Sequence, residues 1–203
     1  MMFGSTFHLP FPAFFYIIYF SGGREIQEEC TEYVKKNGVL SDGDVYTGSS
    51  GTLKCKALVH AVGPEWKDGE SGESKLLIKA ISNCMQEVVK LKAESIVFPA
   101  VCAGIFGFSP EKSCTAIVDT ICNFFEEQKG NAGMREVYLC DINRDCVFCF
   151  MQALEKKLLV YLSIQRNLLI NVWIYLHVLN CVDIGMLVSF LSLNDSDHNV
   201  GKL

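Results

Sequence analysis

Histidine is scarce in this chain of 203 residues: there are four, and they are scattered along the sequence. Such a distribution argues against a metal site built from histidines. A surplus of basic residues is also missing, because 18 Lys and Arg stand against 23 Asp and Glu, for a net charge of -5. No strong positive field would draw the molecule to nucleic acid, so we expect no direct nucleic-acid partner.

The sequence also lacks a second pair of cysteines spaced like Cys146 and Cys149. A zinc ribbon needs two such pairs, so we expect a structural role for this one and no metal. Most of the ten cysteines fall on apolar helix faces or beside strands, where a free thiol packs as a small hydrophobic group. A chain of this length builds a core without disulfides, which points to a reducing compartment, the nucleus or the cytoplasm.

The two ends of the chain are unusually apolar and raise the mean hydropathy to +0.24. No basic segment precedes the aromatic run of residues 7–20, and Ser21-Gly22-Gly23 is a poor cleavage site, so we favour a loosely packed end over a signal peptide. Leu168–Leu193 is long enough to cross a bilayer. It carries four residues that are costly at membrane depth, namely Asn171, His177, Asn180 and Asp183. We therefore favour a tail without defined packing over a membrane span.

Between these ends, hydrophobic periodicity predicts helices that alternate with short strands. Helices are expected at Arg24–Lys36, Glu73–Lys92, Pro110–Gln128 and Asp145–Lys157. Strands are expected at Ala57–Val62, Ser95–Ala100 and Glu136–Asp141. Residues 43–51 have the composition of a polar, turn-rich connection. His60 lies in a predicted buried strand, so we expect a core histidine with satisfied hydrogen bonds and not a catalytic one. This alternation predicts an α/β fold with right-handed crossovers and a mostly parallel sheet covered on both sides.

One loop suggests a chemistry of its own. The segment Cys102–Phe108 lies between the carboxyl end of a predicted strand and the start of a helix, where open α/β sheets bind ligands. Its glycines would let the backbone approach a phosphate, and consecutive N–H groups could point at the anion. The helix that Ser109 caps would add its positive end. The alternative is a tight turn whose aromatic side chains fill the core.

Three separate blocks of the sequence resemble successive parts of a macrodomain. They are VYTGSSGTLKCKALVHAVGPEW (Val45–Trp66), SIVFPAVCAGIFGF (Ser95–Phe108) and VYLCDIN (Val137–Asn143). The resemblance covers about residues 22–158 and extends to the tandem macrodomains of large mono-ADP-ribosyltransferases of the poly(ADP-ribose) polymerase family. It implies a three-layer α/β/α sandwich, with residues 1–21 and 159–203 outside the domain. It also implies ADP-ribose as the ligand and no further cofactor.

By position, the resemblance assigns three groups of residues to an ADP-ribose site. The backbone of the glycine loop would surround the diphosphate, Phe106 would lie beside the distal ribose, and Thr47–Gly51 would shape the neighbouring edge. Cys102 stands where serine is common in the family, a mild change because contacts there are mostly through the backbone. The implied loop residues are Cys102, Ala103, Gly104, Ile105, Phe106, Gly107 and Phe108, and those near the adenine are Asp141, Ile142 and Asn143.

The opening part of the macrodomain pattern does not occur in these 203 residues. A macrodomain normally opens with a strand bearing Gly-Asp-Ile or Gly-Asp-Val, whose Asp binds the adenine amino group. An Asn-Ala-Ala-Asn segment and a first glycine loop follow. Ser21-Gly22-Gly23-Arg24-Glu25 resembles the middle of the helix after that loop. We therefore expect a domain truncated at its N-terminus, with weakened binding.

The resemblance leaves four functions to weigh. The first is a binding module for ADP-ribose or mono-ADP-ribosylated proteins, with a role in ADP-ribosylation and transcription regulation. The second is an ADP-ribosyl hydrolase, although the loops that would position water are missing and Asp42, Asp44 and Asp68 read as solvated turn residues. The third is a fragment of a NAD-dependent mono-ADP-ribosyltransferase whose catalytic domain is absent from this sequence, and the fourth a membrane-tethered remnant. We favour the binding module and expect no catalysis by this chain alone.

Overall fold

The computed structural model describes residues 18, 20–128, 133–164 and 191–192. Its helices are α2 (Arg24–Asn37), α3 (Glu73–Leu91), α4 (Pro110–Gln128) and α5 (Arg144–Ile164). Its strands are β1 (Val45–Gly48), β2 (Ala57–Ala61), β3 (Ser95–Phe98), β4 (Glu136–Leu139) and β5 (Leu191–Ser192). Every helix and strand predicted from the periodicity is present, and most ends lie within two residues of the prediction.

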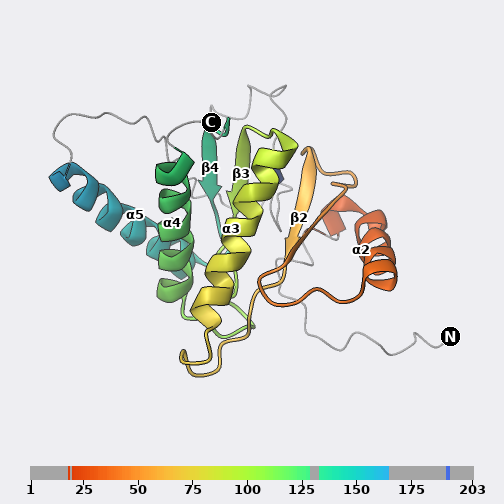
Figure 1. Ribbon diagram of the computed structural model, residues 1–203, viewed down its shortest axis with the longest axis horizontal. Coiled ribbons are helices and arrows are strands. Elements are labelled where there is room, and N and C mark those ends of the chain that lie inside the picture. The colour runs from red at the N-terminus through yellow and green to blue at the C-terminus, as the bar shows by residue number, and fades with distance from the viewer. Residues whose placement is uncertain (1–17, 19, 129–132, 165–190, 193–203) are drawn as a thin grey trace.

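The strands form one mixed sheet in the order β1-β2-β5-β3-β4. β3 and β4 are parallel, with Ser95 opposite Glu136 and Phe98 opposite Leu139. β5 is antiparallel to both of its neighbours, so β2 runs in the same direction as β3 and β4. The three predicted strands therefore run in the same direction, as expected, although only β3 and β4 pair directly in parallel. They all end at one edge of the sheet, which we call the carboxyl edge (Figure 1).

Alternating side chains divide the buried residues between the two faces of the sheet. Leu58 of β2 and Val97 of β3 point into a small cluster with Ile18 and Ile26. The residues next to them on the same strands point into the main core with α3, α4 and α5; they are Val59, Ile96 and Phe98. Helices thus cover both faces, α2 on one and the other three on the opposite one (Figure 1), which confirms the three-layer α/β/α fold.

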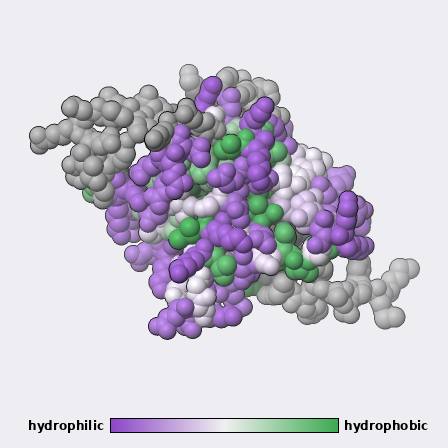
Figure 2. Space-filling model, in the orientation of Figure 1, coloured by the Kyte–Doolittle hydropathy of each residue, from purple (hydrophilic) through white to green (hydrophobic). Residues whose placement is uncertain are grey.

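The helices owe their positions to apolar stripes. On α3, five residues recur at helical spacing and are at most 1% exposed: Leu77, Ile81, Cys84, Met85 and Val88. Burying a large apolar side chain stabilises the fold by about 1.5–3 kcal/mol, so this stripe fixes α3 on the sheet. The outer side of the same layer is mainly hydrophilic, with small separate apolar patches (Figure 2).

β1 lies inside the stretch that the sequence predicts as a turn-rich connection. It pairs antiparallel with β2, with Val45 opposite Ala61 and Gly48 opposite Leu58. Its four residues carry a weak strand signal and end in glycine, and three of them are only half-buried. The pairing with β2 outweighs the local turn preference, because strand formation depends on cross-strand partners more than on intrinsic propensity.

The predicted tail departs from expectation at two points. α5 continues to Ile164, past the predicted end at Lys157. Leu191 and Ser192 pair with β2 and β3 in the middle of the sheet, where we expected no defined packing. The rest of Leu168–Leu193 lies outside the described residues, so the domain end at residue 158 stays a prediction.

The N-terminal segment can be judged only near its end. Ile18 is 1% exposed and packs with Ile26, although we expected residues 1–21 to pack loosely. Residues 1–17 and 19 lie outside the described part of the chain, and the alternatives for them stay open. Among the helices that the structure describes, none combines the length and apolarity that a membrane span requires.

Candidate functional site

The glycine loop Cys102–Phe108 leaves the end of β3 at the carboxyl edge. It is folded by its own hydrogen bonds, such as Gly107 N–H to the Gly104 carbonyl (3.0 Å) and Phe108 N–H to the Cys102 carbonyl (3.1 Å). Cys102 and Gly107 have positive φ values of 66° and 79°, which turn the chain sharply. Four N–H groups of the loop donate no hydrogen bond within the described ranges; they belong to Cys102, Gly104, Ile105 and Phe106. The loop therefore has donors to offer to a ligand.

The Cys102 side chain is buried next to Gly63. It is 6% exposed, and a Cβ added at Gly63 would collide with its sulfur. Burial raises the pKa of the Cys102 thiol to about 12, so the group is an un-ionised, unreactive thiol at neutral pH. Cys102 can thus contribute its backbone, in line with the prediction that contacts here are mostly through the main chain.

The helix behind the loop begins as the sequence predicts. Ser109 caps α4, with its Oγ accepting a hydrogen bond from Lys112 N–H at 3.2 Å, and Pro110 occupies the first helical position. Ser113 Oγ donates to the Val101 carbonyl at 2.5 Å, which ties the first turn of the helix to the loop. The positive end of this 19-residue helix therefore lies directly behind the loop.

The second predicted segment, Asp141–Asn143, lies beside the loop because β3 and β4 are neighbours. Asp141 Oδ2 accepts a hydrogen bond from Ala100 N–H at 3.0 Å, and Oδ1 accepts one from Asn143 N–H at 2.8 Å. Burial raises the pKa of Asp141, and these hydrogen bonds oppose the rise. The carboxylate therefore fastens the two strand ends together. Ile142, 45% exposed, is left facing outward at this edge.

Asn143 has a structural task as well. Its Oδ1 accepts a hydrogen bond from Asp145 N–H at 2.9 Å, so the residue caps α5 and the helix begins one residue before its predicted start. The structure thus brings together both predicted segments at one edge. Which of their residues contact a ligand stays a prediction.

The loop from Gly63 to Gly72 is a third segment at this edge. The sequence-based prediction assigned no function to it. Trp66 N–H donates to the Phe106 carbonyl at 2.6 Å, and its ring meets the edge of Phe108 with centroids 4.9 Å apart. Lys112 Nζ lies 4.0 Å from the centroid of the same ring. The signal for this loop was present in the Val-Gly-Pro-Glu-Trp run, whose turn residues precede a large aromatic.

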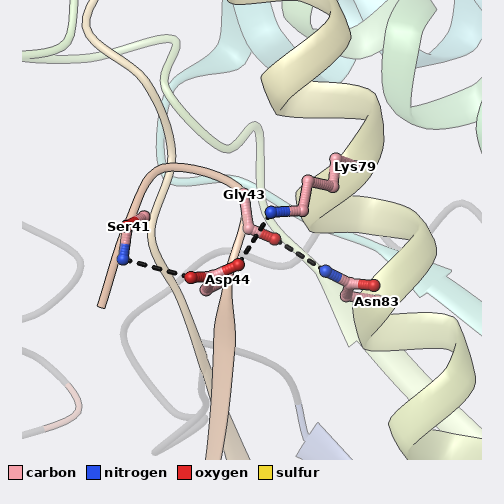
Figure 3. A network of polar contacts seen from close by, with 5 residues as sticks. All are labelled: Ser41, Gly43, Asp44, Lys79 and Asn83. Carbon is pink, nitrogen blue, oxygen red and sulfur yellow. Dashed lines mark hydrogen bonds and ion pairs between the residues drawn. The ribbon is translucent and has the colours of Figure 1, made fainter.

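The turn before β1 is fixed to α3 by the network in Figure 3. Lys79 Nζ pairs with Asp44 Oδ1 at 2.7 Å, and Asn83 Nδ2 donates to the Gly43 carbonyl at 2.8 Å. Gly43 N–H in turn donates to the Val62 carbonyl at the end of β2. Asp44 is therefore a paired residue and not the merely solvated one we expected. Asp68, whose Oδ1 accepts Glu70 N–H at 2.8 Å, is a turn residue as predicted.

The prediction that Thr47–Gly51 shapes the edge next to the glycine loop is wrong. β1 is antiparallel to β2, so Gly48 lies opposite Leu58 at the start of β2. Thr47 Oγ1 donates to Glu87 Oε2 at 2.8 Å, far along α3 from its N-terminus. Thr47–Gly51 therefore lies at the opposite edge of the sheet, and the turn around Gly43 takes the place we assigned to it.

No cluster of three or more metal-binding side chains is found in the ranges that the structure describes. Nine cysteines in these ranges are outside any disulfide, among them Cys146 and Cys149. Cys146 is 2% exposed and belongs to the main core, as the structural interpretation predicts. The arrangement at the carboxyl edge is thus one of backbone donors, a helix end and aromatic side chains.

Comparison with known proteins agrees with this arrangement. The macro domain family model matches residues 16–117. An uncharacterised protein of Thermotoga maritima is 35% identical over 130 residues, which are 64% of this chain and 22% of that protein. Human protein mono-ADP-ribosyltransferase PARP14 is 32% identical over 138 residues, 66% of this chain and 8% of that protein. An Enterobacter O-acetyl-ADP-ribose deacetylase is 30% identical over 107 residues, 53% of this chain and 59% of the enzyme.

A solved structure shares the fold. The Oceanobacillus iheyensis macrodomain, determined with ADP, superposes with a TM-score of 0.62 and 26% identity, covering 70% of this chain and 75% of that one. The chain corresponds to only part of the relatives named above, from 8% to 59% of their length. The family match nevertheless extends over half of the 203 residues and includes the glycine loop. The chain therefore belongs to the macro domain family.

Proposed function

We propose that this chain is a binding module for ADP-ribose, either free or attached to a protein. The observation that carries the proposal is the glycine loop, four of whose N–H groups have no partner among the described residues and lie in front of the N-terminus of α4. A diphosphate is an anion with several acceptor oxygens, which suits consecutive amide donors backed by a helix end. The O. iheyensis macrodomain, solved with ADP, supports the same class of ligand.

The neighbouring side chains suit the rest of such a ligand. Phe106 is half-buried in the loop and offers an aromatic surface to a ribose. Ile142 is exposed after the end of β4 and offers an apolar surface to an adenine ring. Both carboxylate oxygens of Asp141 accept hydrogen bonds from backbone N–H groups. We therefore assign Asp141 the role of holding the two strand ends together, and not a contact with the base.

We expect the binding to be weak. The acidic residue that binds the adenine amino group in macrodomains has no counterpart in these 203 residues. Losing one hydrogen bond to a charged group costs about 1.5–3 kcal/mol, which is roughly a ten- to hundredfold loss of affinity. Selectivity for ADP-ribose over nucleoside monophosphates should remain, because the loop recognises the diphosphate.

Gly104 gives the sharpest test. A Cβ at this position meets nothing within 4 Å and the backbone is not in the left-handed region, so Gly104→Glu adds a carboxylate without straining the fold. Gly107 has a φ of 79° and is unsuitable for the same experiment. We expect Gly104→Glu to abolish ADP-ribose binding by the full chain in isothermal titration calorimetry, through repulsion of the phosphates.

Two matched controls separate charge from shape and from position. Gly104→Ala adds only a Cβ in open space and should bind like the wild type. Leu159→Glu adds the same carboxylate on α5 at a residue 62% exposed, and should also bind normally. Equal affinity of wild type and Gly104→Glu would show that the loop is not the site.

A second candidate is hydrolysis of an ester of ADP-ribose, favoured by the similarity to the Enterobacter deacetylase. A hydrolase needs a general base within reach of a water. Asp141, next to the loop along the sheet edge, already accepts hydrogen bonds through both of its oxygens. Asp42, whose charge acts on the Cys102 thiol, is an exposed residue of the turn before β1. We therefore expect no turnover of O-acetyl-ADP-ribose or of a mono-ADP-ribosylated peptide. Hydrolysis of either substrate faster than in buffer alone would contradict the binding-module proposal and support a hydrolase.

Mono-ADP-ribosylated proteins are the partners that this proposal implies. The nine cysteines outside any disulfide in the described ranges support a reducing compartment, the nucleus or the cytoplasm, as the place of action. NAD-dependent transfer is not part of the proposal, because the chain matches only 8% of the human transferase. Capture of a mono-ADP-ribosylated peptide, but not of its unmodified form, would test the partner class.

A further inference from the structure

Glu73, at the first position of α3, is 3% exposed and accepts three hydrogen bonds through one oxygen. The donors to Oε1 are the N–H groups of Lys67 (3.0 Å), Asp68 (3.1 Å) and Gly69 (3.0 Å). Backbone hydrogen bonds lower the pKa of Glu73 to about 2, so the carboxylate is ionised at neutral pH. Three consecutive amides around one carboxylate oxygen fix the course of this loop.

The loop that Glu73 holds is in contact with the glycine loop. Trp66 comes directly before the three donors, and its own N–H donates to the Phe106 carbonyl at 2.6 Å. A Cβ at Gly107 would lie 3.5 Å from the Cβ of Trp66, and the Trp66 ring packs on Phe108. Trp66 thus lies against the last three residues of the glycine loop, Phe106 to Phe108.

We infer that Glu73 is a positioning residue for the glycine loop, acting through Trp66. The hydrogen bond from Trp66 sets the direction of the Phe106 carbonyl and so the orientation of the peptide groups around it. Those groups are next to the N–H groups of Gly104, Ile105 and Phe106, which donate to no other group in the part of the chain that the structure describes. The inference rests on the proposed function for its ligand, but the contact between the two loops does not depend on that ligand.

A purely structural role for Glu73 makes a different prediction. A carboxylate in the first turn of a helix stabilises the helix, and its loss would lower stability without a specific effect on the site. Glu87 on the same helix is a matched control, because its carboxylate accepts hydrogen bonds from Thr47 (2.8 Å) and Lys90 (2.6 Å) at the opposite edge of the sheet. Both Glu73→Ala and Glu87→Ala remove a hydrogen-bonded carboxylate, but only Glu73→Ala releases the loop that contains Trp66.

The test uses the full chain in a Trp173→Phe background, which leaves Trp66 as the single tryptophan of the two in the sequence. We expect Glu73→Ala to weaken ADP-ribose binding about tenfold, the effect of roughly one hydrogen bond to a charged group. It should also increase acrylamide quenching of Trp66 fluorescence without ligand. Glu87→Ala should change neither, and Glu73→Gln, which keeps one acceptor oxygen, should restore most of both.

The outcomes distinguish the inference from the proposed function. Binding by Glu73→Ala as tight as by Glu87→Ala, with wild type binding normally, overturns the inference and leaves the proposed function intact. No ADP-ribose binding by the wild type overturns the proposed function. The quenching experiment then decides the inference alone: greater quenching in Glu73→Ala than in Glu87→Ala supports it, and equal quenching overturns it.

Discussion

At the residue scale, His60 gives a prediction that depends on pH. It lies in β2 with Cys30 Sγ 3.5 Å from its Nε2 and the Tyr46 ring stacked beside it. Burial lowers the pKa of His60 to about 4, while the charge of Glu29 acts weakly in the other direction. The unfolded chain takes up this proton near the ordinary pKa of 6.5, before the folded chain does. The free energy of unfolding should therefore fall as the pH decreases from 6.5 to about 4.

Urea unfolding of wild type and His60→Gln over this pH range measures the effect. The variant lacks the titrating group, so its stability should depend less on pH across the same interval. Parallel pH profiles for the two proteins would show that His60 is not buried in its neutral form.

The residues of the candidate site were only partly accessible to prediction. The glycine loop was found because Gly104 and Gly107, between a strand and a helix, have a recognisable spacing. Trp66 and Glu73 were missed, because their contacts are formed by the path of a loop and leave no periodic signal. The error at Thr47 has a similar cause: its block of sequence was recognised, but its edge of the sheet depends on the direction of a strand that was not predicted.

At the scale of the elements, the connection between β1 and β2 is held at Gly51. This glycine has a φ of 57°, and a Cβ on it would collide with the carbonyl of Gly22. Gly72 has a φ of 86° and an added Cβ there would meet nothing within 4 Å, so Gly72→Ala measures the backbone effect alone. Gly51→Ala should destabilise the protein by about 1–3 kcal/mol more than Gly72→Ala, the typical effect of overpacking.

Urea unfolding of both variants gives the comparison directly. A difference near zero would mean that the segment around Gly22 does not press on this connection in solution. The same result would argue against the packing of Ile18 and Ile26 on Leu58 in the small core cluster.

The helices were easier to predict than the strands for a physical reason. A helix such as α3 carries its own signal, because its buried residues repeat every three or four positions within 19 residues. β5 has two residues, too few for a period of two to stand out, and β1 lies in a stretch whose polar composition favours turns. Their existence depends on partners distant in the sequence, such as Leu191 opposite both Leu58 and Val97.

At the scale of the whole molecule, β5 links the two halves of the sheet. The structure gives no direct pairing between β2 and β3, because β5 lies between them. A chain that stops after Ile164 would leave the facing edges of β2 and β3 without their backbone partners, and exposed edges promote association. We expect this shortened chain to be less stable than the full chain and to aggregate.

A chain that stops after Leu193 is the matched control, since it loses the last residues but keeps β5. Urea unfolding and light scattering compare the two. If both shortened chains behave like the full one, β5 does not contribute to the folded domain, and the sequence-based prediction of a tail without defined packing stands.

The main-chain character of the glycine loop has a consequence for how such a site is mapped and how it evolves. Replacing Ile105 by alanine leaves its N–H in place, so an alanine scan would pass over the donors that we assign to the ligand. Exchanging single amides of the loop for esters, which removes one N–H and keeps every side chain, would locate them. For the same reason the side chains here are free to drift between relatives while the donors persist. Sequence identity therefore understates how much of this site two macro domains can share.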